Sequence, residues 1–171
     1  MRNKVKKSTI AIIALLVVLA AGVAVLAVLN GKEAAAKKQL RDDAVFLILD
    51  GRTQPETMLA KITMEEYLAL NPVEFEANYK KSGKDPEKRS YTGVPFAAIL
   101  ELKGIDPAQF GSAVFAAADG YASAISIREA LDESNCFIVA DDGGDGPFRM
   151  VLPKDKFSQR WCKLLTDVHL R

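Results

Sequence analysis

The chain has 171 residues, which is enough for one domain and a short additional segment. Its formal charge is +1, but four of its 23 basic residues lie before residue 8, and the other 19 stand against 22 acidic residues. The weakly acidic remainder lacks the net basic character of a nucleic-acid-binding domain, so no nucleic-acid partner is expected.

The N-terminal segment predicts a membrane anchor. Residues 10–29 form an apolar run, and a helix of that length spans about 30 Å, the thickness of a bilayer core. The basic cluster precedes this run, so the positive-inside rule places residues 1–8 in the cytoplasm and the main domain outside. We expect residues 1–30 to be an uncleaved signal anchor; a cleaved signal peptide is the alternative. Residues 31–43 are rich in alanine and charge and predict a helical spacer.

The first part of the main domain predicts two strands around a short helix. Residues 44–49 form a β-type run that ends in a turn. Thr63 and Glu66 have the spacing of a capping box, which opens a helix. Residues 73–80 alternate apolar and polar side chains, as a strand with one buried face does, and residues 88–91 are expected to return beside it.

Residues 91–104 predict a turn, a short helix and a stop. Pro95 suits the first turn of a helix, where its missing N–H would be unpaired anyway. Phe96 and Ile99 begin an apolar face at helical spacing. Gly104 supplies the left-handed residue that ends such a helix.

The rest of the chain mixes strands with short helical turns. Residues 113–118 predict a buried strand, and Ser126–Glu129 a second capping box. Residues 136–140 and 148–152 form a predicted hairpin, and residues 163–170 a final strand. This order lacks βαβ regularity, so the predicted fold class is α+β with a mixed sheet.

Four phrases in one order carry a resemblance to a known family. They are Tyr-Thr-Gly-Val-Pro-Phe-x-x-Ile-Leu-x-x-x-Gly-Ile at 91–105, Ala-Asp-Gly-Tyr at 118–121, Gly-Pro-Phe-Arg-Met-Val-Leu-Pro at 146–153 and Arg-Trp-Cys-Lys at 160–163. Together they resemble the sulfite-oxidase-type molybdopterin-binding domain. The resemblance covers about residues 44–171 and implies that family's mixed-sheet fold and oxidoreductase activity.

In that family, molybdenum is bound by a pterin dithiolene and one protein cysteine. The cysteine falls roughly a dozen residues before the glycine that matches Gly93. Residues 78–82 occupy that place here and contain no cysteine. Ser82 is the candidate oxygen ligand, with an ordinary turn serine as the alternative. The chain therefore resembles this family but lacks its metal-ligand cysteine, and no metal ligand is assigned.

The family's pterin carries a phosphate, which favours cationic side chains. Arg149 and Lys163 match recurring family residues, and Lys156 lies in the region that lines the family's pocket, as do Lys154 and Arg160. We predict a cofactor-binding role for Arg149, Lys156 and Lys163. Ordinary solvent-facing charge is the alternative.

Other reactive residue types give weaker patterns. Cys136 and Cys162 are the only cysteines, and outside the cytoplasm they predict either a disulfide or two buried free thiols. The sole histidine, His169, is expected to be incidental. Residues 141–146 indicate a glycine-rich hairpin loop rather than a calcium site, and residues 119–121 a structural turn.

Three functions remain open. The first is a membrane-anchored extracytoplasmic domain that has lost redox chemistry, needs no cofactor and binds a ligand or partner. The second is a working molybdopterin-dependent oxidoreductase that passes electrons to a membrane protein. The third is an envelope structural or interaction module without a small ligand. The missing cysteine favours the first or the third.

Overall fold

The computed structural model describes three helical residues near the N-terminus, Leu16, Leu19 and Gly22, and then residues 45–80, 85–140 and 147–171. The chain separates into two units, residues 1–40 and 41–171, and the second unit contains every described strand. Across the described residues, no helix is both long and apolar enough to cross a membrane. The predicted anchor lies outside these residues except for the three named, and the predicted spacer lies wholly outside them.

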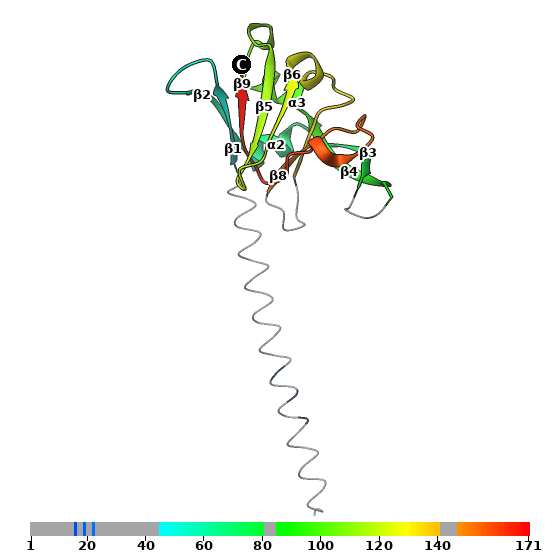
Figure 1. Ribbon diagram of the computed structural model, residues 1–171. Coiled ribbons are helices and arrows are strands. Elements are labelled where there is room, and N and C mark those ends of the chain that lie inside the picture. Colours follow the sequence, from blue (N-terminus) through cyan, green and yellow to red (C-terminus); the bar gives the residue numbers. More distant parts are fainter. Residues whose placement is uncertain (1–15, 17–18, 20–21, 23–44, 81–84, 141–146) are drawn as a thin grey trace, which may run out of the picture. The chain divides into compact units, whose positions relative to one another are not determined.

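Two β-sheets build the domain (Figure 1). The strands of sheet A are β1 (Val45–Asp50), β2 (Thr57–Thr63), β5 (Ser112–Ala117), β6 (Ala122–Ser126) and β9 (Leu165–Leu170). Those of sheet B are β3 (Val73–Tyr79), β4 (Glu87–Pro95), β7 (Phe137–Ala140) and β8 (Phe148–Val151). Sheet A runs in the order β2-β1-β9-β5-β6 and sheet B in the order β3-β4-β7-β8. The pair β1–β9 is parallel and its neighbours in sheet A are antiparallel, which confirms the α+β class with a mixed sheet.

Short helices connect the strands. They are α2 (Met64–Ala69), α3 (Phe96–Leu102) and α4 (Ile127–Ala130), with 3-10 turns η1 (Pro107–Gln109) and η2 (Ser158–Arg160). The predicted capping box of α2 is confirmed: Glu66 N–H donates to Thr63 Oγ1 at 3.2 Å, and Thr63 N–H donates to Glu66 Oε2 at 3.0 Å. The other Glu66 oxygen lies 2.5 Å from Lys103 Nζ, which ties α2 to the end of α3.

Pro95 differs from its predicted place. It is the last residue of β4 and the N-cap of α3, with extended backbone, rather than a residue of the first helical turn. The reason is that β4 continues its pairing with β7 as far as Pro95 and Phe137. Phe96 N–H then donates to the Cys136 carbonyl at 2.9 Å. Gly104 has the predicted left-handed backbone, with φ of +62°.

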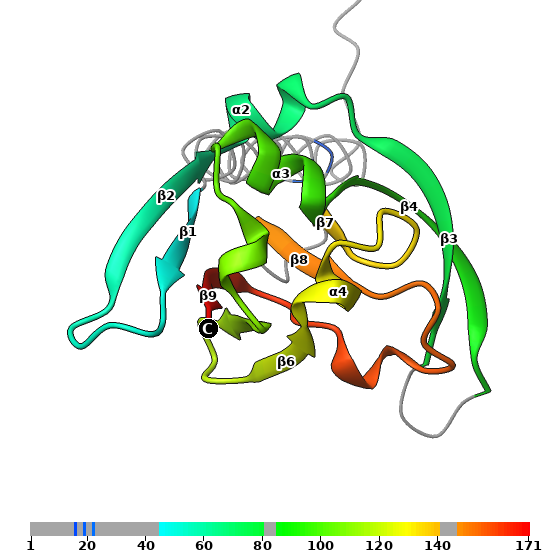
Figure 2. The ribbon, with the colours of Figure 1, turned by 90° about the horizontal axis from the view of Figure 1, so that it is seen from above.

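The core lies between the two sheets, with α2 and α3 beside it (Figure 2). The Phe148 ring on sheet B meets Phe46 of sheet A at 5.2 Å and Tyr67 of α2 at 5.3 Å, both edge to face. Phe96 of α3 meets Phe115 of sheet A at 5.1 Å. Rings from both sheets and two helices therefore interlock in one core, as close packing requires.

Two strands were not predicted, β2 and β6, and both are edges of sheet A. An edge strand has one neighbour, so it buries fewer side chains and shows weaker alternation. The second capping box is also only half formed. Ser126 Oγ accepts from Glu129 N–H at 3.2 Å, but the Glu129 carboxylate pairs with Arg160 at 2.8 Å instead of returning to Ser126.

Candidate functional site

Arg149, the first predicted cofactor-binding residue, lies on β8 with only 8% of its surface exposed. Its neighbour Phe148 points into the core, so alternation places Arg149 on the other face of sheet B. Burial lowers the pKa of its guanidinium, while the nearby hydroxyls of Tyr91 and Tyr79 oppose that shift and Arg89 adds to it. Arginine stays charged in proteins, so this is a buried cation held against aromatic side chains.

Five aromatic side chains cover this face of sheet B and form what we call the aromatic cluster: Phe75, Tyr79, Tyr91, Phe137 and Trp161. Phe75 stacks on Phe137 with ring centroids 4.0 Å apart and on Tyr91 at 5.9 Å. Trp161 meets Tyr91 edge-on at 5.5 Å and lies 6.2 Å from Tyr79. Such pairs add about 0.5–1.5 kcal/mol each beyond their buried area. The rings fill the face beside Arg149.

Gly93 makes this stack possible. It is paired with Val73 on one side and Val139 on the other, in the middle of sheet B. A Cβ at this position would stand 2.8 Å from the Ile138 carbonyl oxygen and 3.1 Å from the Phe75 ring. Only a residue without a side chain lets the ring cross the strand here.

The other two predicted cofactor-binding residues lie over aromatic rings. Lys163 Nζ is 5.9 Å from the ring centroid of Tyr79, and Lys156 Nζ is 5.4 Å from that of Phe157. Contacts of this kind contribute about 0.5–1 kcal/mol at exposed sites. The structure therefore brings Lys163 to the cluster that surrounds Arg149 and places Lys156 on a ring of the connector after β8.

The end of β3, where the family resemblance places the metal-ligand cysteine, is clamped by that connector. Asn78 Nδ2 donates to the Asp155 carbonyl at 3.4 Å. Lys80 N–H donates to Ser158 Oγ at 3.2 Å, and the Ser158 hydroxyl donates to the Lys80 carbonyl at 3.3 Å. These groups hold the connector in place rather than face an open site. The candidate ligand Ser82 lies outside the described residues.

Cys136 and Cys162 are free and buried. Cys162 pairs with Met150 on one side of β8, whereas Cys136 comes directly before β7 on the other side. With strands about 4.8 Å apart, the two Cα atoms are separated by about 10 Å, more than a disulfide spans. The structure thus has the predicted alternative of two buried thiols and not the disulfide.

These thiols do not fit the metal ligand of the resembled family. Burial raises the pKa of Cys162 to about 12, and burial also raises the pKa of Cys136. Both are protonated at neutral pH, whereas the thiolate is the form that binds metal. Within the described part of the chain, no group of three or more His, Cys, Asp and Glu side chains could hold a metal ion.

The remaining cations of the predicted region are bound to carboxylates. Lys154 Nζ lies 2.6 Å from Asp132 Oδ2. Arg160 donates to Asp155 at 2.9 Å through Nε and to Glu129 at 2.8 Å through a terminal nitrogen. Both side chains anchor the connector to α4 and the loop that follows it.

Two further sequence features have structural contacts. The turn at residues 119–121 is confirmed: Gly120 has φ of +87°, and Tyr121 N–H donates to Asp119 Oδ1 at 3.0 Å. His169 Nδ1 lies 2.7 Å from Glu56 Oε2, so the sole histidine joins β9 to the start of β2.

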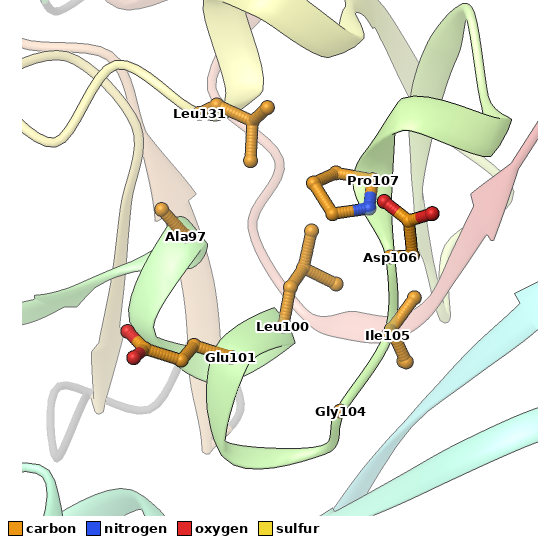
Figure 3. Close-up of a pocket in the computed structure, with 8 residues that line it drawn as sticks. All are labelled: Ala97, Leu100, Glu101, Gly104, Ile105, Asp106, Pro107 and Leu131. Carbon is orange, nitrogen blue, oxygen red and sulfur yellow. The ribbon is translucent and has the colours of Figure 1, made fainter.

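A surface pocket of about 340 Å³ lies elsewhere, beside α3 (Figure 3). Its lining is mainly apolar and includes Leu100, Ile105 and Leu131, with the carboxylates of Glu101 and Asp106 at its sides. Asp106 is occupied in capping η1, because its Oδ1 accepts from Ala108 N–H at 3.0 Å. The pocket contains none of the predicted site residues.

Sequence reasoning missed Arg89, which stacks on the Tyr79 ring with its guanidinium 4.0 Å from the centroid. Arg89 and Tyr91 are two residues apart on one predicted strand, and Tyr79 lies on the strand before it. That spacing was visible in the sequence. The register that sets Arg89 opposite Ala77, and so beside Tyr79, was not.

Comparison with known proteins supports the fold at a distance. No protein-family model and no curated protein sequence matches the chain. Among solved structures, the chain resembles the sulfane dehydrogenase SoxCD from Paracoccus pantotrophus, with a TM-score of 0.59 and 15% identity. The match covers 76% of this chain and 38% of that one. The described domain thus has a fold found in an oxidoreductase subunit, and it spans well under half of that subunit's length.

Proposed function

We propose that the chain, whose main domain has this oxidoreductase-like fold, is a membrane-anchored, extracytoplasmic, non-catalytic member of the sulfite-oxidase-type molybdopterin-binding fold that binds a partner protein. The fold is supported by the likeness to the sulfane dehydrogenase and by the four phrases between residues 91 and 163. The membrane location is supported by the apolar run at residues 10–29 and the basic residues before it.

The observation that carries the loss of catalysis is the clamped end of β3. A metal-binding thiolate belongs there in the resembled family, and the place holds Asn78 and Lys80, both bonded to the connector. The two thiols of the chain lie in the core with raised pKa values.

A partner protein is favoured over a small anionic ligand because of how the predicted phosphate-binding cations are held. Arg149 is buried against the aromatic cluster, and Lys163 lies over the Tyr79 ring. Only 8% of the Arg149 surface is exposed, which opposes the binding of a phosphate to its guanidinium. The proposed partner is a membrane redox protein or another envelope protein.

The test is the molybdenum and pterin content of the full chain. It is expressed in a host that makes the cofactor and, as a control, in the same host with cofactor synthesis disabled. Metal is measured by elemental analysis and pterin by fluorescence after oxidative release. We expect the two preparations to be indistinguishable. Near-stoichiometric metal and pterin only in the first host would establish the alternative, an active molybdopterin-dependent oxidoreductase, and Ser82→Ala would then locate its ligand.

A further inference from the structure

The outer face of sheet A, opposite the core, is unusually apolar. Residues of β1 and β5 that point inward, such as Ile48 and Phe115, are fully buried, so their neighbours point outward. The outward apolar positions are Val45, Leu47 and Leu49 on β1, Met58 on β2, Val114 and Ala116 on β5, and Ala122 and Ala124 on β6. We call this set the outer apolar face.

A sheet with one face in water normally alternates apolar and polar residues, with the polar ones outward. Strand β1 breaks that rule at all three of its outward positions, whereas β2, β5 and β6 carry outward polar residues as well as apolar ones, namely Lys61, Thr63, Ser112 and Ser126. Met58 is 60% exposed and Val45 is 38% exposed. Helices α2, α3 and α4 and the whole of sheet B lie on the inner side of sheet A (Figure 2). No element among residues 45–80, 85–140 and 147–171 covers the face.

Two opposite charges, Lys61 and Asp167, lie on this face in line with Leu47. Strand pairing places Lys61 of β2, Leu47 of β1 and Asp167 of β9 side by side, so the two charges lie one strand to either side of Leu47. The spacing between neighbours is about 4.8 Å. At the end of the sheet, Glu56 already binds His169 at 2.7 Å and Arg171 at 3.7 Å.

We propose that the outer apolar face binds the same face of a second copy of this chain, sheet against sheet. In this dimer a two-fold axis parallel to β1 lies midway between the two sheets. Rotation about this axis places the β2 side of one copy over the β9 side of the other. It therefore sets Lys61 of each copy over Asp167 of the other, across the roughly 10 Å between packed sheets. The apolar residues of β1 meet at the axis. Two identical copies of this face therefore present opposite charges to each other. This favours a second copy of the chain over a partner of a single charge sign.

The dimer is expected to be weak in solution. Five strands span about 24 Å and the apolar rows run about 17 Å along them, which gives roughly 400 Å² per copy. A standard interface buries about 800 Å² per partner. Anchoring both copies in one membrane, as proposed above, would raise their effective concentration and favour pairing. That anchor affects only the affinity of the dimer, and the pairing is independent of whether a cofactor binds.

The experiment is a charge swap measured by sedimentation equilibrium of the full chain in density-matched detergent. We expect the wild-type chain to form dimers, and Lys61→Asp or Asp167→Lys to raise the dimer dissociation constant about tenfold or more. The double variant, with both changes, should return it to near the wild-type value, because the charges are again opposite across the axis. Lys88→Asp, on an exposed pair of sheet B, should have no effect.

Each other outcome overturns the proposal. A wild-type chain that stays monomeric at millimolar concentration has no such interface. If neither single variant changes the dimer dissociation constant, the dimer forms through another surface, for example through the N-terminal segment. A double variant that is no better than the singles rules out this pairing of charges. Leu49→Asp should abolish dimers while Leu102→Asp on α3 does not, and thermal unfolding confirms that every variant is folded.

Discussion

Gly93 shows how one residue can determine a surface. Its place in the family-like phrase predicted only a turn before the helix. In the structure it lies in the middle of sheet B and leaves the space that the Phe75 ring crosses to reach Phe137. The stacking of Phe75 on Phe137 therefore depends on a residue with no side chain.

Replacing Gly93 with alanine should destabilise the domain by about 1–3 kcal/mol, the usual cost of overpacking. The added methyl would lie 2.8 Å from a backbone oxygen, which cannot move away as a flexible side chain can. Gly111→Ala is the matched control, since its nearest contact would be an ordinary 3.7 Å. Urea unfolding measures the free energy of unfolding of both variants. Equal stability of the two variants would show that the ring stack adapts to the methyl.

Among the secondary-structure elements, α2 is fastened to sheet B by Tyr67. Its hydroxyl donates to the Ile138 carbonyl at 3.0 Å and accepts from Ala140 N–H at 3.2 Å. Burial of the hydroxyl raises the pKa of Tyr67 from 10.0 to about 12, although the backbone donors partly oppose the shift. The unfolded chain therefore releases this proton at a lower pH than the folded domain does.

This difference predicts a loss of stability in alkali. Below pH 10 both states keep the Tyr67 proton, and between pH 10 and about 12 only the folded state does. The free energy of unfolding should fall across that window by about 2–3 kcal/mol. Tyr67→Phe should be less stable by about 1–3 kcal/mol at neutral pH but should lack this part of the alkaline loss. Tyr121→Phe, which removes a hydrogen bond from a surface hydroxyl to the Gln159 carbonyl at 2.8 Å, is the control. Parallel pH profiles for wild type and Tyr67→Phe would contradict the assignment.

In the molecule as a whole, both sheets and the core between them lie within residues 45–171. A core of this size supports independent folding. The strand order also joins distant parts of the chain, because β9 at the C-terminal end lies between β1 and β5. The fold is therefore complete only when the last strand is in place.

A chain that begins at Gly31 should consequently fold without the N-terminal segment. It should show one cooperative thermal transition and lose it when β9 is removed by ending the chain at residue 163. Differential scanning calorimetry measures both. Purified protein from Gly31 onward that shows no cooperative transition would mean that the preceding residues are needed for folding.

Elements with local patterns could be predicted from the sequence alone. The capping box at Thr63, the helix after Pro95, the turn at Gly120 and the central strands each follow from neighbouring residues, and the structure confirms them. The α+β class also followed from the order of these elements, and the likeness to an oxidoreductase fold followed from the four phrases between residues 91 and 163.

The content of the candidate site, by contrast, depends on tertiary structure. Strand register set Arg89 beside Tyr79, and strand order put β8 between the two cysteines. The edge strands β2 and β6 form by pairing with β1 and β5, and their own sequence patterns did not predict them. These features depend on pairing between residues far apart in the chain, and a one-residue change of register would turn every side chain to the other face. Local sequence does not specify such pairing, so the chemistry of the site became visible only in the folded chain.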